Sequence, residues 1–196
     1  NLFAGLEEIT TENEPLAKYT WLKIGGPARY FIKPRSAEEL ATVICRCREN
    51  GFPWRVLGQG ANLLIDDKGI NAAVIKLDHE AFRQIDLAAT SVTIGAGASL
   101  SVAVQETIKA GLSGMEILVG IPGSLGGAIK MNAGGRFGDI GTLVAQIEVV
   151  DTSGTAFWRE KPELSFDYRE TNITDQVVTQ VQLELTPDDP HRILTR

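Results

Sequence analysis

The segments of this chain that could do chemistry are rich in glycine, and the most concentrated is GIPGSLGGAIKMNAGG at 120–135. It holds six of the 20 glycines, and its only charged residue is Lys130. A linker would be polar, whereas this stretch interleaves apolar side chains. An interior glycine costs a packed helix or strand roughly 0.5–1 kcal/mol relative to alanine. We therefore expect bare backbone to lie against a large ligand here.

Three further glycine-containing segments fall at expected strand ends or turns, at 25–27, 58–62 and 95–97. Any one of them alone is best explained as a tight turn. Together they favour a phosphate-bearing cofactor, because loop N–H groups can bind an anion without charged side chains. The usual nucleotide motifs are not present. Residues 58–63 lack the third glycine of the dinucleotide fingerprint, so a Rossmann site is not expected. Residues 120–127 lack Gly-Lys-Ser/Thr, so they are not a nucleoside-triphosphate loop.

Composition narrows the class of protein. The net charge of −6 and the pI near 5.0 argue against a surface for duplex nucleic acid. No apolar run approaches the roughly 20 residues that span a bilayer, and the start of the chain lacks the features of a signal peptide. We expect a cytoplasmic monomer that binds neither nucleic acid nor membrane.

The cysteines and histidines do not form a metal-binding pattern. Cys45 and Cys47 are two residues apart in an expected helix and point to different faces, so we expect reduced thiols. His79 and His191 stand alone, and we expect both at the surface. No metal site is expected.

Apolar periodicity predicts an α+β chain with more strand than helix. Helices are expected at 36–51, where Ser36 and Glu39 form a capping box, and at 100–110. Strands are expected at 19–24, 28–33, 54–57, 63–65, 73–77, 91–97, 143–150, 156–159 and 177–185. We divide the chain into subdomains at 1–77 and 78–187, with 188–196 as the start of a linker.

The motifs IGGPARYF, VLGQGANLLI, GAGASL, GLSGMEILVGIPGSLGGAIKMNAGG and FDYR follow one another over roughly residues 19–185. In this order they resemble the UDP-N-acetylenolpyruvoylglucosamine reductases, flavoenzymes that complete UDP-N-acetylmuramate for peptidoglycan. The resemblance implies the vanillyl-alcohol-oxidase-type (PCMH) FAD-binding fold, a non-Rossmann arrangement of two α/β subdomains with FAD between them.

The resemblance also implies which residues contact FAD. Residues 58–64 would wrap the pyrophosphate, and 120–128 would run along the flavin. The expected cofactor-binding residues are Leu57, Gly58, Gln59, Gly60, Ala61, Asn62, Leu63, Gly120, Ile121, Pro122, Gly123, Ser124, Gly126, Gly127 and Ala128. Ala61 departs from the family, which commonly has a small hydroxyl residue there.

In the reaction that the resemblance implies, NADPH reduces FAD, and hydride then passes to the enolpyruvyl double bond of the UDP-sugar. Arg169 matches the family arginine that stabilises charge developing toward the carboxylate. Tyr168 and Asn132 are expected at the substrate. Taken alone, Tyr168–Arg169 would be interpreted as a surface loop pair. The sequence 132–137, NAGGRF, departs from the family, because the aromatic residue is shifted by one position.

The resemblance places a third, substrate-binding domain beyond residue 196, with a serine proton donor and a late glutamate. We therefore expect this chain to be the FAD-binding portion of the reductase. Two alternatives remain open. One is a non-catalytic module that binds FAD or a nucleotide-sugar. The other is an oxidase of the same fold acting on a small alcohol or amine, which is disfavoured because the flavin-side loops lack His and Cys for covalent attachment.

Overall fold

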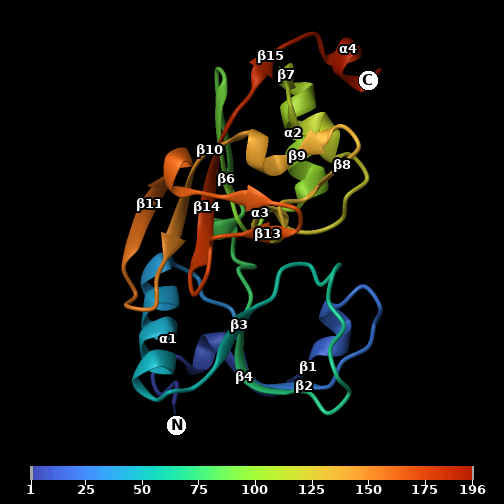
Figure 1. Ribbon diagram of the computed structural model, residues 1–196. Helices are drawn as coiled ribbons and strands as arrows, with labels where there is room; N and C mark the ends of the chain where they lie inside the picture. Colours follow the sequence, from blue (N-terminus) through green and yellow to red (C-terminus); the bar gives the residue numbers. More distant parts are fainter. Residues whose placement is uncertain (1, 196) are drawn as a thin grey trace.

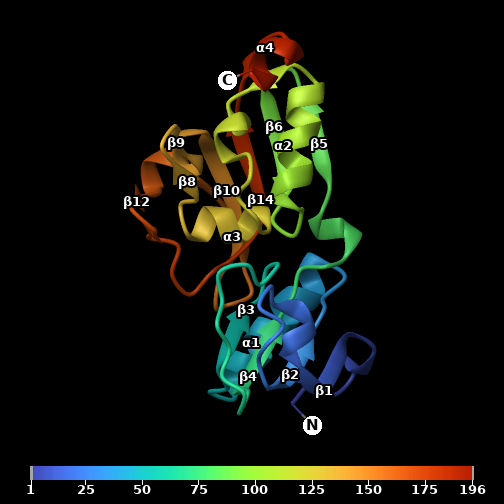
Figure 2. The same cartoon turned by 90° about the vertical axis from the view of Figure 1, so that its right-hand side faces the viewer.

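A computed structural model describes residues 2–195, in which two β-sheets with their own helices lie one above the other (Figure 1). The N-terminal sheet has the strand order β1-β2-β4-β3, and the C-terminal sheet has the order β11-β10-β14-β6-β5. This arrangement is α+β, as expected from the sequence. Figure 2 shows the chain crossing once from the lower sheet to the upper one between β4 and β5.

The N-terminal sheet combines parallel and antiparallel pairs. Its strands are β1 (Thr10–Pro15), β2 (Pro27–Ile32), β3 (Trp54–Val56) and β4 (Ile70–Ile75). β1 is antiparallel to β2, whereas β2 and β3 both run parallel to β4. Because β3 and β4 are parallel, their carboxyl ends lie together at one edge of the sheet.

Helix α1 (Ala37–Glu49) covers one face of this sheet, as its apolar stripe predicts. Leu40 and Ile44 of the helix belong to one core cluster with Ile32 and Ile75 of the sheet. The Ser36 hydroxyl accepts from the Glu39 N–H at 3.3 Å and caps the helix. The opposite face has a smaller core of its own, which consists of Leu16, Ala28, Phe31, Leu57 and Val74.

The C-terminal sheet is antiparallel throughout. Its strands are β5 (Ile85–Ala88), β6 (Ser91–Gly95), β10 (Val144–Val150), β11 (Ala156–Glu160) and β14 (Val177–Glu184). Helices α2 (Leu100–Lys109) and α3 (Leu125–Lys130) pack beside one another, and α3 contacts β6 and β14. Short elements complete this part: β7 (Leu112–Ser113), β8 (Gly134–Gly135), β9 (Gly138–Asp139), β12 (Phe166–Asp167), β13 (Glu170–Thr171), β15 (Thr186–Pro187) and α4 (Pro190–Leu194).

Six short 3-10 helices connect these elements within residues 2–195. They are η1 (Glu7–Ile9), η2 (Leu16–Tyr19), η3 (Glu80–Phe82), η4 (Met115–Leu118), η5 (Ile140–Thr142) and η6 (Lys161–Glu163).

Two expected strands are wrong. Tyr19 ends η2, and residues 20–24 form a turn, because the Thr20 hydroxyl donates to Ala17 O and Ile24 O while Lys23 takes a positive φ of 56°. Residues 63–65 form an irregular loop in which Leu64 is 76% exposed, so their apolar character does not come from burial in a sheet.

Several elements have no clear signal in the sequence, among them β1, β5 and α3. β1 is a charged edge strand with the sequence TTENEP, and β5 is a mostly exposed edge strand. The third is α3, which lies inside the stretch that we expected to be a loop. A Cβ on Gly126 would stand 2.9 Å from the Ala96 Cβ, so glycine lets this helix approach the end of β6 closely.

Candidate cofactor site

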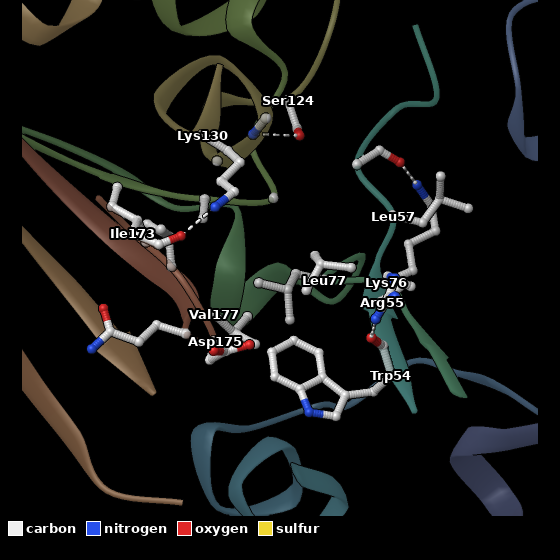
Figure 3. A pocket seen from close by; sticks show the side chains of 18 of the residues that line it. Trp54, Arg55, Leu57, Lys76, Leu77, Ser124, Lys130, Ile173, Asp175 and Val177 are labelled. Atoms are coloured by element: carbon white, nitrogen blue, oxygen red, sulfur yellow. Dashed lines mark hydrogen bonds between the residues drawn. The ribbon is translucent and has the colours of Figure 1, made fainter. Parts of the chain in front are cut away.

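A cavity of about 640 Å³ lies between the two sheets (Figure 3). Its volume falls within the range of small-molecule and cofactor pockets. The N-terminal wall comes from residues in 47–59 and 76–83, and the C-terminal wall from residues in 96–97, 124–130 and 173–178, with Thr152. The cavity therefore requires both halves of the chain.

The N-terminal wall is built at the carboxyl ends of β3 and β4. Residues 57–59 follow β3, and residues 76–78 follow β4. Ligands of sheets with parallel strands commonly bind outside these strand ends, where connecting loops supply free backbone groups. The topology thus places the first two residues of the GQGAN loop, Gly58 and Gln59, at the cavity.

This loop has unused hydrogen-bond donors. Within residues 2–195, no backbone N–H from residues 58–65 donates to another group of the chain. Backbone N–H groups require a partner, either water or a ligand. A run of such groups can bind an anion without charged side chains. The loop therefore has the donors that a diphosphate needs.

The cavity is also cationic, in contrast to the chain as a whole. Its lining includes the basic residues Arg48, Arg55, Lys76, Arg83 and Lys130, and the acidic residues Asp78 and Asp175. Five positive charges against two negative ones favour an anionic ligand, although the whole chain has a net charge of −6.

Six of the expected cofactor residues line the cavity: Leu57, Gly58, Gln59, Ser124, Gly126 and Gly127. The others lie outside its lining: Gly60, Ala61, Asn62, Leu63, Gly120, Ile121, Pro122, Gly123 and Ala128. A Cβ on Gly60 would stand 2.2 Å from Tyr19 O, and its φ is +67°. The structure thus explains Gly60 by chain packing.

The four glycine segments do not all meet at one site. Gly97 lines the cavity along with parts of the 58–62 and 120–128 segments, but 25–27 does not. Gly26 instead packs against the backbone of Asp67 and donates to Asp66 O at 2.9 Å. The 25–27 segment therefore packs against the last residues of the connection between β3 and β4.

The expected catalytic residue lies on a hairpin outside the cavity lining. Tyr168 and Arg169 form the turn between β12 and β13, and Tyr168 is 87% exposed. Arg169 has a positive φ of 58°, and its guanidinium carbon lies 5.4 Å from the centre of the Tyr168 ring. The pair extends from the chain at a position where a separate ligand or domain can reach it.

Asn132, expected at the substrate, holds this hairpin in place. Its Nδ2 donates to Asp167 O at 3.1 Å, and its Oδ1 accepts from the Gly141 N–H at 3.1 Å. Beside it, the Thr171 hydroxyl donates to Lys130 O at 3.2 Å. The end of α3 is thus joined to the hairpin that carries Arg169.

Sequence reasoning did not identify several cavity residues, notably Trp54, Lys76, Ile173 and Val177 (Figure 3). Trp54 and Lys76 could have been found from the sequence. Trp54 lies on β3, which leads into the expected loop, and Lys76 directly follows the neighbouring parallel strand β4. Ile173 and Val177 could not be found in this way, since only the three-dimensional fold brings them to the cavity.

Cys47 also lies along the cavity wall, from helix α1. It is 0% exposed, and burial raises the pKa of its thiol to about 11. A thiol in such surroundings is unreactive, because the thiolate is the nucleophile. Its position therefore does not favour covalent attachment of a cofactor.

The part of the chain that the structure describes contains no group of three or more His, Cys, Asp or Glu residues placed to hold a metal ion. Among the same residues, no helix has both the length and the apolar character needed to cross a bilayer.

Comparison with known proteins defines the class. Residues 28–159 match the family described as FAD binding domain. The chain belongs to this family, and the FAD cofactor expected from its sequence is confirmed.

Relatives of known name confirm the particular resemblance. The chain is 41% identical over 176 residues to the UDP-N-acetylenolpyruvoylglucosamine reductase of Heliobacterium modesticaldum, covering 89% of this chain and 56% of that protein. It is 38% identical over 197 residues to the reductase of the same name from Moorella thermoacetica, covering 100% of this chain and 64% of the relative. The chain thus spans roughly three fifths of the length of these relatives.

Solved structures agree on the fold. The crystal structure of UDP-N-acetylenolpyruvylglucosamine reductase from Thermus caldophilus matches with a TM-score of 0.80 at 37% identity, over 95% of this chain and 65% of the other. A solvent-stable cholesterol oxidase matches with a TM-score of 0.65 at 18% identity, over 92% of this chain and 38% of the other. The vanillyl-alcohol-oxidase-type FAD-binding fold is therefore confirmed.

Proposed function

We propose that this chain is the FAD-binding portion of an NADPH-dependent UDP-N-acetylenolpyruvoylglucosamine reductase, which acts in peptidoglycan synthesis. The observation that carries the proposal is the cationic cavity between the sheets, bordered by a loop with unused N–H donors. FAD has an anionic diphosphate and a long apolar ring system, and the cavity offers partners for both. The similarity to reductases along nearly the whole chain supports the choice of reaction.

The proposal places FAD between subdomains 1–77 and 78–187. The diphosphate would lie at the loop that follows β3, where backbone N–H groups and Lys76 are available. The flavin would extend toward Ser124, Gly126 and Gly127 at the start of α3. The exposed part of the 120–128 segment would then contact regions of the ligand that extend beyond the cavity.

When bound, FAD supplies hydride transfer. Arg169 would hold the substrate carboxylate, toward which negative charge develops, through a permanently charged guanidinium. Asn132 would act by holding the β12–β13 hairpin and thereby placing Arg169. Tyr168, fully available at the turn, would contact the substrate or the arginine. The UDP-sugar and NADPH would be the partners of the protein. The proposal also includes a cytoplasmic location and a monomeric state.

An FAD titration followed by visible absorption and fluorescence tests the cofactor site. The reaction is tested separately, by NADPH oxidation with the enolpyruvyl UDP-sugar, in the longer polypeptide that contains this chain. Saturable FAD binding with substrate-dependent NADPH oxidation supports the proposal. FAD binding without turnover in that longer polypeptide would favour the alternative of a non-catalytic binding module. Turnover of a small alcohol or amine with oxygen would favour the oxidase.

A further inference from the structure

Lys76 is a partly buried cation that faces the cavity. It directly follows β4, and its Nζ donates to Gly58 O at 2.7 Å. Figure 3 shows Lys76 and Lys130 approaching from opposite sides of the cavity. Lys130 donates to Ile173 O, so each lysine secures the main chain of its own wall. Lys76 is the more enclosed of the two.

The charge of Lys76 is not neutralised by a neighbouring carboxylate. None of the ion pairs within residues 2–195 includes it. The nearest acid along the chain, Asp78, instead lies 3.1 Å from Lys33 Nζ and 3.9 Å from an Arg83 nitrogen. Burial lowers the pKa of Lys76, and the charge of Asp78 only partly opposes this effect.

An ammonium group has three N–H donors, and within residues 2–195 one of those of Lys76 has a hydrogen-bond acceptor. The centre of the Tyr19 ring lies 6.0 Å from the same Nζ. A buried cation is costly unless it is paired. Because Lys76 lines the cavity, an anion bound there would supply such a partner. The carbonyl that Lys76 holds belongs to the same loop whose N–H groups are unused from residue 58 to residue 65.

We propose that Lys76 determines FAD affinity by holding the Gly58 loop and by supplying the positive charge that neutralises the FAD diphosphate. The proposal rests on membership of the FAD-binding family and not on the reductase reaction. It assigns the glycine loop and the lysine complementary roles: the loop orients N–H donors, and Lys76 provides the charge that the loop itself lacks.

The test compares variants in the full polypeptide that contains this chain. Lys76→Gln keeps a hydrogen-bond donor without the charge, Lys76→Arg keeps the charge, and Lys76→Met removes both. Lys109→Gln, which removes an exposed charge from α2, is the matched control. FAD and riboflavin dissociation constants are measured for each by fluorescence, because riboflavin lacks the diphosphate.

We expect Lys76→Gln and Lys76→Met to weaken FAD binding at least about tenfold, and Lys76→Arg to stay within about threefold of the parent. Riboflavin binding should be unchanged in all variants. The dependence of FAD affinity on salt concentration should fall for the two uncharged variants. The Lys109→Gln control should behave like the parent.

Two results would overturn the proposal. In one, folded Lys76→Gln and Lys76→Met proteins bind FAD as tightly as the parent. In the other, FAD and riboflavin weaken equally, which would show that Lys76 only shapes the cavity. Absence of NADPH-driven turnover would leave the FAD measurements intact, so a failure of the proposed reaction is distinguishable.

Discussion

Gly58 and Ser124 meet so closely across the cavity that a Cβ on Gly58 would stand 2.4 Å from the Ser124 hydroxyl oxygen. Gly58 follows a strand of the N-terminal sheet, and Ser124 caps α3 by accepting from the Gly127 N–H at 3.3 Å. The contact joins two segments that the sequence predicted to bind the same cofactor. The two halves of the chain touch where FAD is proposed to pass.

This contact predicts that substitutions at the two positions are coupled. Gly58→Ala should destabilise the protein by about 1–3 kcal/mol, because the methyl group displaces the serine hydroxyl. Ser124→Ala should cost about 1 kcal/mol through loss of the helix cap. In the double variant the added Cβ would meet the residue 124 Cβ at 3.6 Å, an ordinary contact. Its destabilisation, measured by urea unfolding, should be smaller than the sum of the single effects, and strict additivity would contradict the prediction.

Asn132→Asp should loosen the hairpin that carries Arg169. Aspartate tolerates the positive φ of 42° at this position and keeps an acceptor for the Gly141 N–H, but it cannot donate to Asp167 O. We expect a loss of about 1–3 kcal/mol in unfolding free energy and faster hydrogen exchange over 166–171. Gln105→Ala, exposed on α2, is the control. Unchanged exchange in the hairpin would contradict the role given to Asn132.

The two cysteines should react very differently with iodoacetamide at pH 8. Cys45 is partly exposed, whereas Cys47 is fully buried with a thiol pKa of about 11. Mass spectrometry of the native protein should find the label on Cys45 alone, and Cys47 should be labelled only after denaturation. Cys45→Ser should leave the native protein unlabelled. Rapid labelling of Cys47 would show that the wall formed by α1 opens.

The lowered pKa of Glu39 predicts that the fold loses part of its stability in acid. Hydrogen bonding from Arg35 holds the pKa of Glu39 below its usual 4.5. A carboxyl with a lowered pKa contributes stability above its unfolded-state pKa, and this contribution disappears as the pH falls through the lowered value. Glu39→Gln should therefore be less stable than the parent at pH 7, with the difference vanishing in strong acid. Glu49→Gln, at the exposed end of α1, should show no such trend in thermal unfolding.

Most regular elements could be predicted where the buried residues recur with the period of a helix or a strand. Helices α1 and α2 and strands β6, β10, β11 and β14 were all expected near their observed positions. The failures have physical causes. β1 is a polar edge strand held by its pairing with β2, so its side chains carry no signal. α3 contains two glycines that weaken helix propensity, and tertiary packing against Ala96 overrides this cost.

The sequence indicated which loops belong to the candidate site, but not how their side chains are arranged in space. Glycine spacing indicated the loop at Gly58 and the segment at Ser124, because both need close backbone approach. Nothing in the sequence indicated that the Asn132 amide would bond to main-chain partners. Nor did it indicate that Lys76 would bond to a carbonyl and form no ion pair within residues 2–195. Such properties depend on contacts between residues far apart along the chain.

The cavity walls are joined by distant contacts, and this has a consequence for how the protein matures. Lys130 bonds to a residue 43 positions further along the chain, and the Cys45 thiol, on α1, bonds to Ser153 O, 108 positions away. Contacts of such long range form late, because loop closure opposes them. We therefore expect FAD to bind only a chain whose tertiary structure is nearly complete. During refolding, FAD binding should therefore occur after helix formation, and its rate should report the rate of the last folding step.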